Sequence, residues 1–306
     1  MEGHNKTKSN FKGKRPDEII NANSDNELVK YDNELNTVPF KRFRSVEMSI
    51  FFAIVSKMRD KNLEKVRFPF SDLRKLSRYA HKTTPVFIQD LKKTYHKMLG
   101  LTVYSEENGE YYEWVLFTGF HISQKHKFVD ISVNPEKKYI LNDLSNWTRF
   151  SLQEFNKLKS SYTKTIFRLC KQWRTYGGLY LNVKKFRDQL NIPKSYKTND
   201  INRRILKPAK KELKKIWPEF DYDSQLSKKR GHRLVGYWFI WTKEARNKKD
   251  ILNVSNKDNF AFIWEHKKTS NKIYAKERPK KIGQGKKVHK TSNKKAYKAY
   301  KEFKDS

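Results

Sequence analysis

The sequence predicts an α+β fold made of two similar domains that follow one another along the chain. The length of 306 residues suits about two domains of ~100–200 residues each. The aromatic content of 14% excludes a disordered chain, because such chains lack the apolar surface that offsets their ordering entropy. The order helix, strand, helix, helix, β-hairpin is predicted twice along the sequence, and this repeat indicates the two domains.

The first domain is predicted over residues 27–148, after a flexible tail at 1–26 that is polar and mixed in charge. A strand-like run opens it. An apolar residue at every third or fourth position of 45–58 then predicts a buried helix. Apolar residues alternate over 66–70, which is typical of a short half-buried strand, and Ser71 is a good N-cap for a small helix behind it.

A longer helix and a hairpin complete this domain. Thr84-Pro85 predicts a helix start with Thr84 as the N-cap, because Pro at the first helical position loses no needed hydrogen bond. Gly100 is predicted to stop this helix. Asn108-Gly109 between two apolar runs is the strongest short hairpin signal, and the alternating run 129–133 is expected to complete the same small sheet. The residues predicted to face inward are Phe87, Ile88, Leu91, Tyr95 and Met98.

The second domain is predicted over residues 149–250. Ser151 and Glu154 form a capping box, from which one amphipathic helix is expected to run to Trp173. A strand at 179–181 follows, and Asn182 is a suitable cap for the next short helix.

A basic helix and a second hairpin end this domain. The helix is predicted over 200–217, and Pro208 inside it predicts a kink or a tightened turn. The hairpin runs from Phe220 to Trp241 around a basic tip. The apolar stripe of the helix consists of Ile201, Ile205, Ala209, Leu213 and Ile216. In both halves the order of elements is that of a winged helix, in which a helix-turn-helix carries a β-wing.

The charge balance predicts a polyanionic partner. Lys and Arg number 68 against 33 Asp and Glu, which gives a formal net charge of +35. Nucleic acid is the first candidate and an anionic membrane the second. Accumulation of Lys and Asn in an AT-rich genome is the alternative explanation, although it does not easily account for the two-to-one ratio of basic to acidic side chains.

The sequence also predicts a cytoplasmic protein. Its first ten residues are polar, so no signal peptide is expected, and no segment approaches the ~20 apolar residues that a membrane helix needs. The region 251–306 is predicted to be a basic, largely disordered tail, with 13 Lys or Arg against 3 Asp or Glu from residue 271 onward. Phosphate contacts and simple solubilisation are both open as its role.

The helix within 197–215 is the main candidate for DNA contact, because eight basic residues there face only Asp200 and Glu212. Arg clamps a guanine edge with two hydrogen bonds and Lys mostly neutralises phosphates, so Arg203 and Arg204 are predicted to contact bases. The alternative interpretation of this helix is a solvated Lys-rich face. For the first-domain helix, the alternative to DNA contact is a structural or dimerising role. The predicted DNA-contacting residues are Lys197, Arg203, Arg204, Lys207, Lys210, Lys211 and Lys214 of this helix, Lys228, Arg230 and Arg233 of the hairpin tip, and Lys82, Thr83, Thr84, Lys92 and Lys93 of the first domain.

Catalytic and metal sites are not predicted. Cys170 is the only cysteine, which excludes an intramolecular disulfide and a multi-cysteine zinc site, and its apolar neighbours predict a buried packing residue. No His-x-His pair and no phosphate-binding glycine loop occurs. We therefore expect no enzyme, no catalytic or metal-binding residue and no cofactor.

Three segments resemble the plasmid initiator Rep family, which comprises iteron-binding initiators of theta replication. They are SYTKTIFRLCKQW at 161–173, FRDQLNIPKSYK at 186–197 and DINRRILKPAKKEL at 200–213, of which the last resembles the family's recognition helix. The resemblance implies that two winged helices bind directly repeated double-stranded DNA at a plasmid origin. It also implies that monomers help to open AT-rich DNA and recruit host replication proteins, a helicase or an initiator. Homodimers, assembled mainly through the first domain, would repress the initiator's own gene.

Two other functions stay open at the level of sequence. One is a two-domain winged-helix transcriptional regulator without a role in replication, and the other is a basic RNA-binding or structural protein. Direct repeats beside the gene would favour the initiator, an inverted repeat over a promoter the regulator, and preference for single-stranded RNA the third. In the initiator, recognition helices in successive major grooves would lie ~10–10.5 bp apart.

Overall fold

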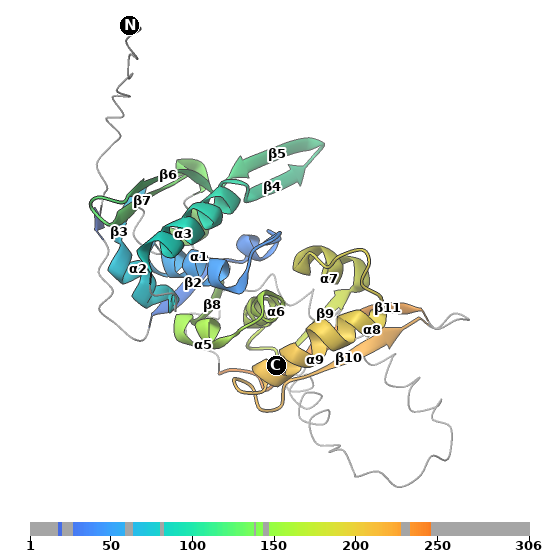
Figure 1. Ribbon diagram of the computed structural model, residues 1–306. Coiled ribbons are helices and arrows are strands. Elements are labelled where there is room, and N and C mark those ends of the chain that lie inside the picture. Colours follow the sequence, from blue (N-terminus) through green and yellow to red (C-terminus); the bar gives the residue numbers. More distant parts are fainter. Residues whose placement is uncertain are drawn as a thin grey trace, which may run out of the picture.

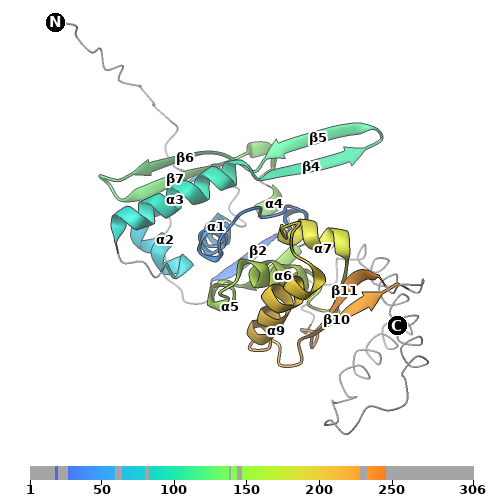
Figure 2. The same cartoon turned by 45° about the vertical axis from the view of Figure 1, so that its right-hand side comes forward.

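Two winged-helix units follow one another in the computed structural model (Figure 1), and a view turned by 45° shows the same arrangement (Figure 2). The structure describes residues 18–19, 27–58, 64–79, 83–137, 139–142, 147–227 and 233–245. The predicted tail at 251–306 lies outside these described residues, as do 1–17 and 20–26 of the predicted tail at 1–26.

The first unit has the predicted order of elements. Its helices are α1 (Ser45–Met58), α2 (Phe70–Ser77), α3 (Thr84–Leu99) and α4 (Tyr139–Asn142), with the 3-10 turns η1 (Asn33–Asn36) and η2 (Pro135–Lys137). Its strands are β1 (Glu18–Ile19), β2 (Leu28–Asp32), β3 (Lys65–Pro69), β4 (Thr102–Glu107), β5 (Glu110–Val115), β6 (Phe117–Ser123) and β7 (Phe128–Val133). The five residues predicted to face inward from α3 are all buried.

Two helix starts in this unit differ from the prediction by one or two residues. The amide of Phe87 donates to the carbonyl of Thr83, so Thr83 rather than Thr84 is the N-cap of α3. Helix α2 begins directly after Pro69, whose extended backbone ends strand β3, so Ser71 lies inside the first turn instead of capping it.

The sheet of the first unit also differs from the prediction. Asn108 and Gly109 both have positive φ, 54° and 83°, which is the two-residue turn that joins β4 to β5. These two strands form a separate sheet that projects from the body of the unit (Figure 1), whereas the four-stranded sheet has the order β1-β3-β7-β6. Strand β1 pairs in parallel with β3, so Glu18 and Ile19 of the predicted flexible tail belong to the fold.

The second unit repeats the order with its own elements. They are β8 (Trp147–Ser151), α5 (Leu152–Lys157), α6 (Ser161–Gln172), β9 (Gly178–Asn182), α7 (Val183–Leu190), α8 (Thr198–Ile201), the π-helical turn η3 (Asn202–Leu206), α9 (Lys207–Leu213), β10 (Asp221–Leu226) and β11 (Leu234–Ile240). Strand β8 crosses the domain boundary predicted after residue 148 and pairs antiparallel with β2 of the first unit. The sheet of the second unit has the order β10-β11-β9.

The single helix predicted from Ser151 to Trp173 is two helices. Ser151 caps α5 by accepting the Glu154 amide, as predicted, but α5 ends before Leu158. The next amide, that of Lys159, donates to the Glu212 carboxylate over 2.7 Å, and Ser160 then caps α6. A tertiary acceptor and a second N-cap therefore replace the helical hydrogen bonds at this point.

One hydrophobic core runs through both units. Phe52 of α1 lies 4.8 Å from Phe155 of α5, measured between ring centroids, and Phe155 lies 5.2 Å from Phe150 of β8. Phe150 contacts Phe167 of α6 at 5.3 Å, and Phe167 contacts Trp217 at 5.4 Å. All five rings are buried, so the two winged helices are joined by packed aromatic side chains.

Helix α6 lies at the centre of this core. Cys170 on this helix is fully buried, as predicted, and burial raises the pKa of its thiol well above the ordinary value. Three cations on the same helix, Lys164, Arg168 and Lys171, are buried as well. None of the helices in the described part of the chain has the length and apolar character that crossing a membrane requires.

Lys164 is held by groups of the first unit. Its Nζ donates to the carbonyl of Ser45 over 2.8 Å and to Oγ of Ser49 over 2.5 Å, and it lies 4.8 Å from the centre of the Phe155 ring. Burial lowers the pKa of Lys164 to about 7, although the charge of Glu212 acts in the opposite direction. The positive charge of Lys164 is therefore disfavoured in the folded protein.

Replacing Phe155 by Ala should lower the free energy of unfolding by about 3–5 kcal/mol, because a large cavity opens at the centre of the core. Both units should unfold in one transition, since they share that core. Urea titration followed by circular dichroism and by tryptophan fluorescence measures both quantities. Phe155→Leu, which leaves a smaller cavity, should cost less, and two separate transitions in the native protein would contradict a shared core.

Replacing Lys164 by Met should remove a rise of stability with pH. The folded pKa is about 7 and that of an unfolded lysine is about 10.4. The unfolded chain therefore binds more protons between these values, and the free energy of unfolding increases with pH there, by at most about 1.4 kcal/mol per pH unit. Urea titrations between about pH 7 and about pH 9 should show this rise in the native protein and in Lys157→Met, which removes an exposed charge. Equal slopes of the free energy of unfolding against pH in Lys164→Met and in the native protein would contradict this prediction.

Candidate nucleic-acid interface

The predicted DNA-contacting helix spans α8, η3 and α9 without interruption. Its start is closed by Asp200, whose carboxylate accepts the backbone amide of Lys197 over 3.2 Å. The buried residues of this helix are Ile201, Ile205, Leu206, Ala209 and Leu213, and Ile216 in the turn behind it is half-buried. The predicted apolar stripe is confirmed, and it holds the helix against α6.

The middle turn of this helix is wider than an α-helical turn. The amide of Lys207 donates to the carbonyl of Asn202, five residues earlier. Of the two alternatives predicted at Pro208, a kink or a tightened turn, the tightened turn is therefore wrong. Proline lacks an amide hydrogen and its ring crowds the carbonyl of the fourth residue before it, and a π-helical turn relieves both problems. At the wide turn both Ile205 and Leu206 are buried in the core.

Arg203 and Arg204 are exposed and share one acceptor. The side chain of Arg203 is 71% exposed and that of Arg204 52%, and each lies near Oδ1 of Asp200, at 3.4 and 3.5 Å. The guanidinium of Arg204 also lies 5.0 Å from the ring centre of Tyr196 and donates to its hydroxyl over 3.4 Å. This hydroxyl is the main cause that raises the pKa of Arg204 above its ordinary value. Asp200 and Tyr196 therefore favour one arrangement of these two exposed side chains.

The two residues that support the arginines, Asp200 and Tyr196, are not among the predicted DNA-contacting residues. Asp200 lies three residues before Arg203 and four before Arg204, which is the spacing of ion pairs along a helix, so a charge-pair search would have found it. Tyr196 lies outside the helix, and only the folded turn brings its ring beneath Arg204.

The lysines of the helix separate into two groups. Lys197, Lys207, Lys211 and Lys214 are exposed. Lys210 instead lies against the wing, where its Nζ is 2.6 Å from Oδ1 of Asp221.

A hydrogen bond attaches the wing to the helix in addition to the Lys210–Asp221 ion pair. The hydroxyl of Tyr222 on β10 donates to Oδ1 of Asn202 over 2.6 Å. Arg233, at the start of the returning strand, is exposed. The predicted contacts Lys228 and Arg230 lie in the tip, outside the described residues.

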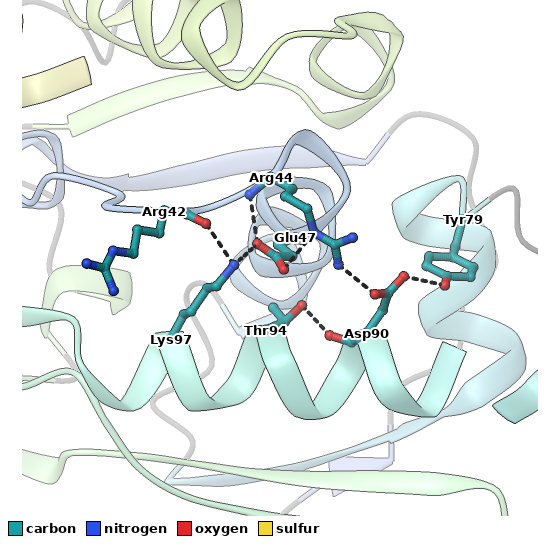
Figure 3. Close-up of polar contacts among 7 residues, drawn as sticks. All are labelled: Arg42, Arg44, Glu47, Tyr79, Asp90, Thr94 and Lys97. Atoms are coloured by element: carbon teal, nitrogen blue, oxygen red, sulfur yellow. Dashed lines mark hydrogen bonds and ion pairs between the residues drawn. The ribbon is translucent and has the colours of Figure 1, made fainter. Parts of the chain in front are cut away.

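Helix α3 of the first unit is anchored by a network of ion pairs and hydrogen bonds around two buried carboxylates (Figure 3). Asp90 accepts from Arg44 Nη2 over 2.6 Å and from the Tyr79 hydroxyl over 2.7 Å. Burial opposes ionisation of Asp90, but these two hydrogen bonds and the positive charges of Arg44 and Lys93 together outweigh it and hold the pKa of Asp90 below its ordinary value. Glu47, which is fully buried, accepts from Arg44 and from Lys97.

The exposed face of α3 carries few positive charges. Lys92 and Lys93 are exposed, as are Thr83 and Thr84 at its start, whereas Lys82 lies outside the described residues. Lys97, at the far end, donates to the carbonyl of Arg42 over 2.7 Å in addition to Glu47. The structure thus brings four of the five predicted first-domain residues onto one helix and its cap.

The two wings differ in charge. Residues 102–115 of the first wing contain four Glu and no Lys or Arg. Tyr111 and Tyr112 are 59% and 48% exposed, and the ring of Tyr112 stacks on that of Trp114. Carboxylates repel phosphates, so the first wing is unsuited to the DNA backbone.

Two winged helices, one of which presents an oriented arginine pair on a basic helix, define a winged-helix DNA-binding protein. Two family models match the chain: "Initiator Replication protein, WH1" at 28–171 and "Initiator Rep protein, WH2" at 182–241. A "Probable replication protein rep" of Bifidobacterium longum (strain NCC 2705) is 33% identical over 224 residues, which are 72% of this chain and 74% of that protein. The chain therefore belongs to the plasmid initiator Rep family.

The fold is similar to that of a solved initiator. The crystal structure of the Pi initiator protein in complex with iteron DNA superposes with a TM-score of 0.54 at 14% sequence identity, covering 74% of this chain and 100% of that chain. At this identity the similarity concerns the fold alone. The family match to the first winged helix ends at residue 171 and so includes most of α6, beyond the boundary predicted at 148.

Replacing Lys207 and Lys211 by Gln should weaken DNA binding and lower the salt dependence of log K by about 1 for each lost phosphate contact. Replacing Glu110 and Glu113 by Gln should not weaken binding, because the first wing carries no phosphate-binding charge. Fluorescence anisotropy at several salt concentrations measures both effects on one duplex. A loss of affinity in the Glu double variant would show that the first wing does contribute to binding.

Proposed function

We propose that this protein initiates replication of the plasmid that encodes it by binding directly repeated DNA at the origin. The observation that carries the proposal is the arginine pair on the α8–α9 helix, oriented by Asp200 and Tyr196 in a protein of the initiator family. Arg203 and Arg204 contact guanine edges in the major groove, and Lys197, Lys207, Lys211 and Lys214 neutralise the flanking phosphates. Lys210, which is bound to Asp221, contributes less.

In this proposal the two units contribute unequally to DNA binding. Residues 149–250 supply the principal recognition helix and, through Lys228, Arg230 and Arg233, a wing that contacts the backbone. Residues 27–148 supply α3, whose cap and exposed lysines contact the adjacent major groove, about one turn or ~10–10.5 bp away. The solved Pi initiator, which binds iteron DNA with the same fold, supports this arrangement.

Regulation and partners follow from family membership. We infer an equilibrium between monomers and homodimers, in which dimerisation takes place mainly through the first unit and the dimer represses the initiator's own gene. We also infer that bound monomers recruit the host helicase or initiator. The basic region 251–306 adds phosphate contacts that do not depend on sequence.

A footprint on DNA flanking the protein's own gene tests the proposal. At physiological salt and with competitor DNA, the purified protein should protect evenly phased direct repeats, each about two turns long. Arg203→Ala and Arg204→Ala should each lower affinity for the repeat by about 1–3 kcal/mol and relax its sequence preference. Lys184→Ala, which removes an exposed charge on α7, is the matched control and should keep the footprint.

Other outcomes would point elsewhere. Protection of one inverted repeat over a promoter would indicate a regulator, and preference for single-stranded RNA would indicate an RNA-binding protein. Protection no stronger than that of competitor DNA would refute the replication function.

A further inference from the structure

Helix α6 belongs to both winged helices at once. It is a helix of the second unit, where it packs on β8, β9, α7 and α9, and it also contacts α1 and η1 of the first unit. The contacts that fix the rotation and depth of α6 on the first unit therefore also fix where the α8–α9 helix of the second unit lies relative to α3 of the first unit.

Arg168 attaches α6 to the first unit through three acceptors. Its side chain is fully buried. Nη1 donates to the carbonyl of Leu35 over 3.0 Å and to Oδ1 of Asn36 over 3.2 Å, and Nη2 donates to the carbonyl of Val38 over 2.9 Å. These acceptors surround a planar group with fixed donor directions, so they restrict both the rotation and the insertion depth of the side chain.

Lys164 provides a second attachment one helical turn earlier. Its bonds to the Ser45 carbonyl and to Ser49 bind α6 to the start of α1. Residues four apart lie on the same face of a helix, about 5–6 Å from each other. Two anchors on one face prevent α6 from rotating about its axis and from sliding along α1.

A gain in stability is a poor explanation for the buried contacts of Arg168 and Lys164. The acceptors of Arg168 and Lys164 are neutral carbonyl, amide and hydroxyl oxygens, and such groups do not fully offset the cost of removing a cation from water. The aromatic core already supplies apolar contact between the units, but apolar packing is less directional than hydrogen bonding. Buried polar groups are best attested as devices that select one register among similar ones.

We propose that Arg168 and Lys164 determine the distance and angle between the two recognition helices, and thereby the spacing between the two halves of the DNA site that the protein accepts. The inference rests on the proposed function, because it assumes that both helices engage one site. Arg168 and Lys164 are positioning residues, since they act through α6 and do not touch DNA.

A spacing series tests the DNA part of the proposal. The probe is the repeat found by footprinting, together with duplexes in which one or two base pairs are inserted or deleted between its halves. One added base pair moves the second half by about 3.4 Å and turns it by about 34°, and the native protein should lose about tenfold or more in affinity. Arg168→Met and Lys164→Met should bind the altered duplexes almost as well as the original one.

Two further variants separate positioning from folding. Lys171→Met removes a buried cation of the same helix whose partner, Glu244, lies at the end of the second unit, so it should keep the native spacing preference. Arg168→Lys retains a donor at the same place and should restore part of the preference. If Arg168→Met does not fold, Lys164→Met carries the test.

A distance measurement keeps the inference separate from the proposed function. Spin labels at Gln89→Cys on α3 and Lys211→Cys on α9 report the separation of the two helices without DNA, since the native Cys170 is buried. The distribution should be narrow in the native background and in Lys171→Met, and broad or shifted in Arg168→Met and Lys164→Met. Native distributions and native spacing profiles in both variants would overturn the inference. A changed distribution in a protein that binds no repeat would uphold the positioning role and refute the DNA function.

Discussion

The packing of α6 between the two winged helices is the constraint on which the rest of the structure depends. Two domains joined only by a linker would move independently, and a small polar contact between them would permit the same. Here a run of buried rings from Phe52 to Trp217 passes through α5, β8 and α6. The α8–α9 helix, which we propose to contact DNA, rests on α6, so its position is set by the core of the first unit. In the proposed mode of binding, DNA recognition thus depends on packing far from the proposed DNA-contacting surface.

The basic side chains of this protein have structural roles as well as a role in binding a polyanion. Lys164 and Arg168 are buried between the units, Lys97 is bound to Glu47 beneath α3, and Lys210 is bound to Asp221 of the wing. Lys164 and Arg168 contribute to the formal net charge although they are buried, and Lys97 and Lys210 have carboxylate partners inside the protein. The net charge therefore indicates the class of partner, but it overstates the number of cations that are exposed and without an internal partner.

Much of the fold follows from sequence patterns of short range. The apolar stripe from Ile201 to Leu213, the inward face of α3 and the Asn108-Gly109 turn are all where periodicity and turn chemistry predict them. The failures have tertiary causes. The break between α5 and α6 depends on Glu212, which is more than fifty residues from Lys159 and takes up its amide.

The candidate site shows the same division between local and distant information. The exposed arginines could be predicted from helical spacing and composition, because both depend on neighbours within a few turns. The stacking of Arg204 on Tyr196 and the ion pair of Lys210 with Asp221 could not be predicted in this way. Tyr196 is brought to the helix by a turn and Asp221 by a strand, and both depend on the tertiary fold. The wide turn at η3 is an intermediate case: Pro208 marks the position, but the choice between tightening and widening depends on whether the core accepts both Ile205 and Leu206.

The acidic first wing gives the molecule an electrical polarity. It projects from the first unit, while the basic α9 helix lies on the second unit, well apart from it in both views (Figure 1; Figure 2). Opposite charges separated in this way form a dipole, and the field of DNA turns a dipole before contact is made. Under the proposed function, a molecule that approaches DNA with the acidic wing forward would be rotated until the α9 helix leads. More of its collisions then begin in the orientation in which the helix can enter the groove, and this advantage diminishes as salt shortens the range of the field.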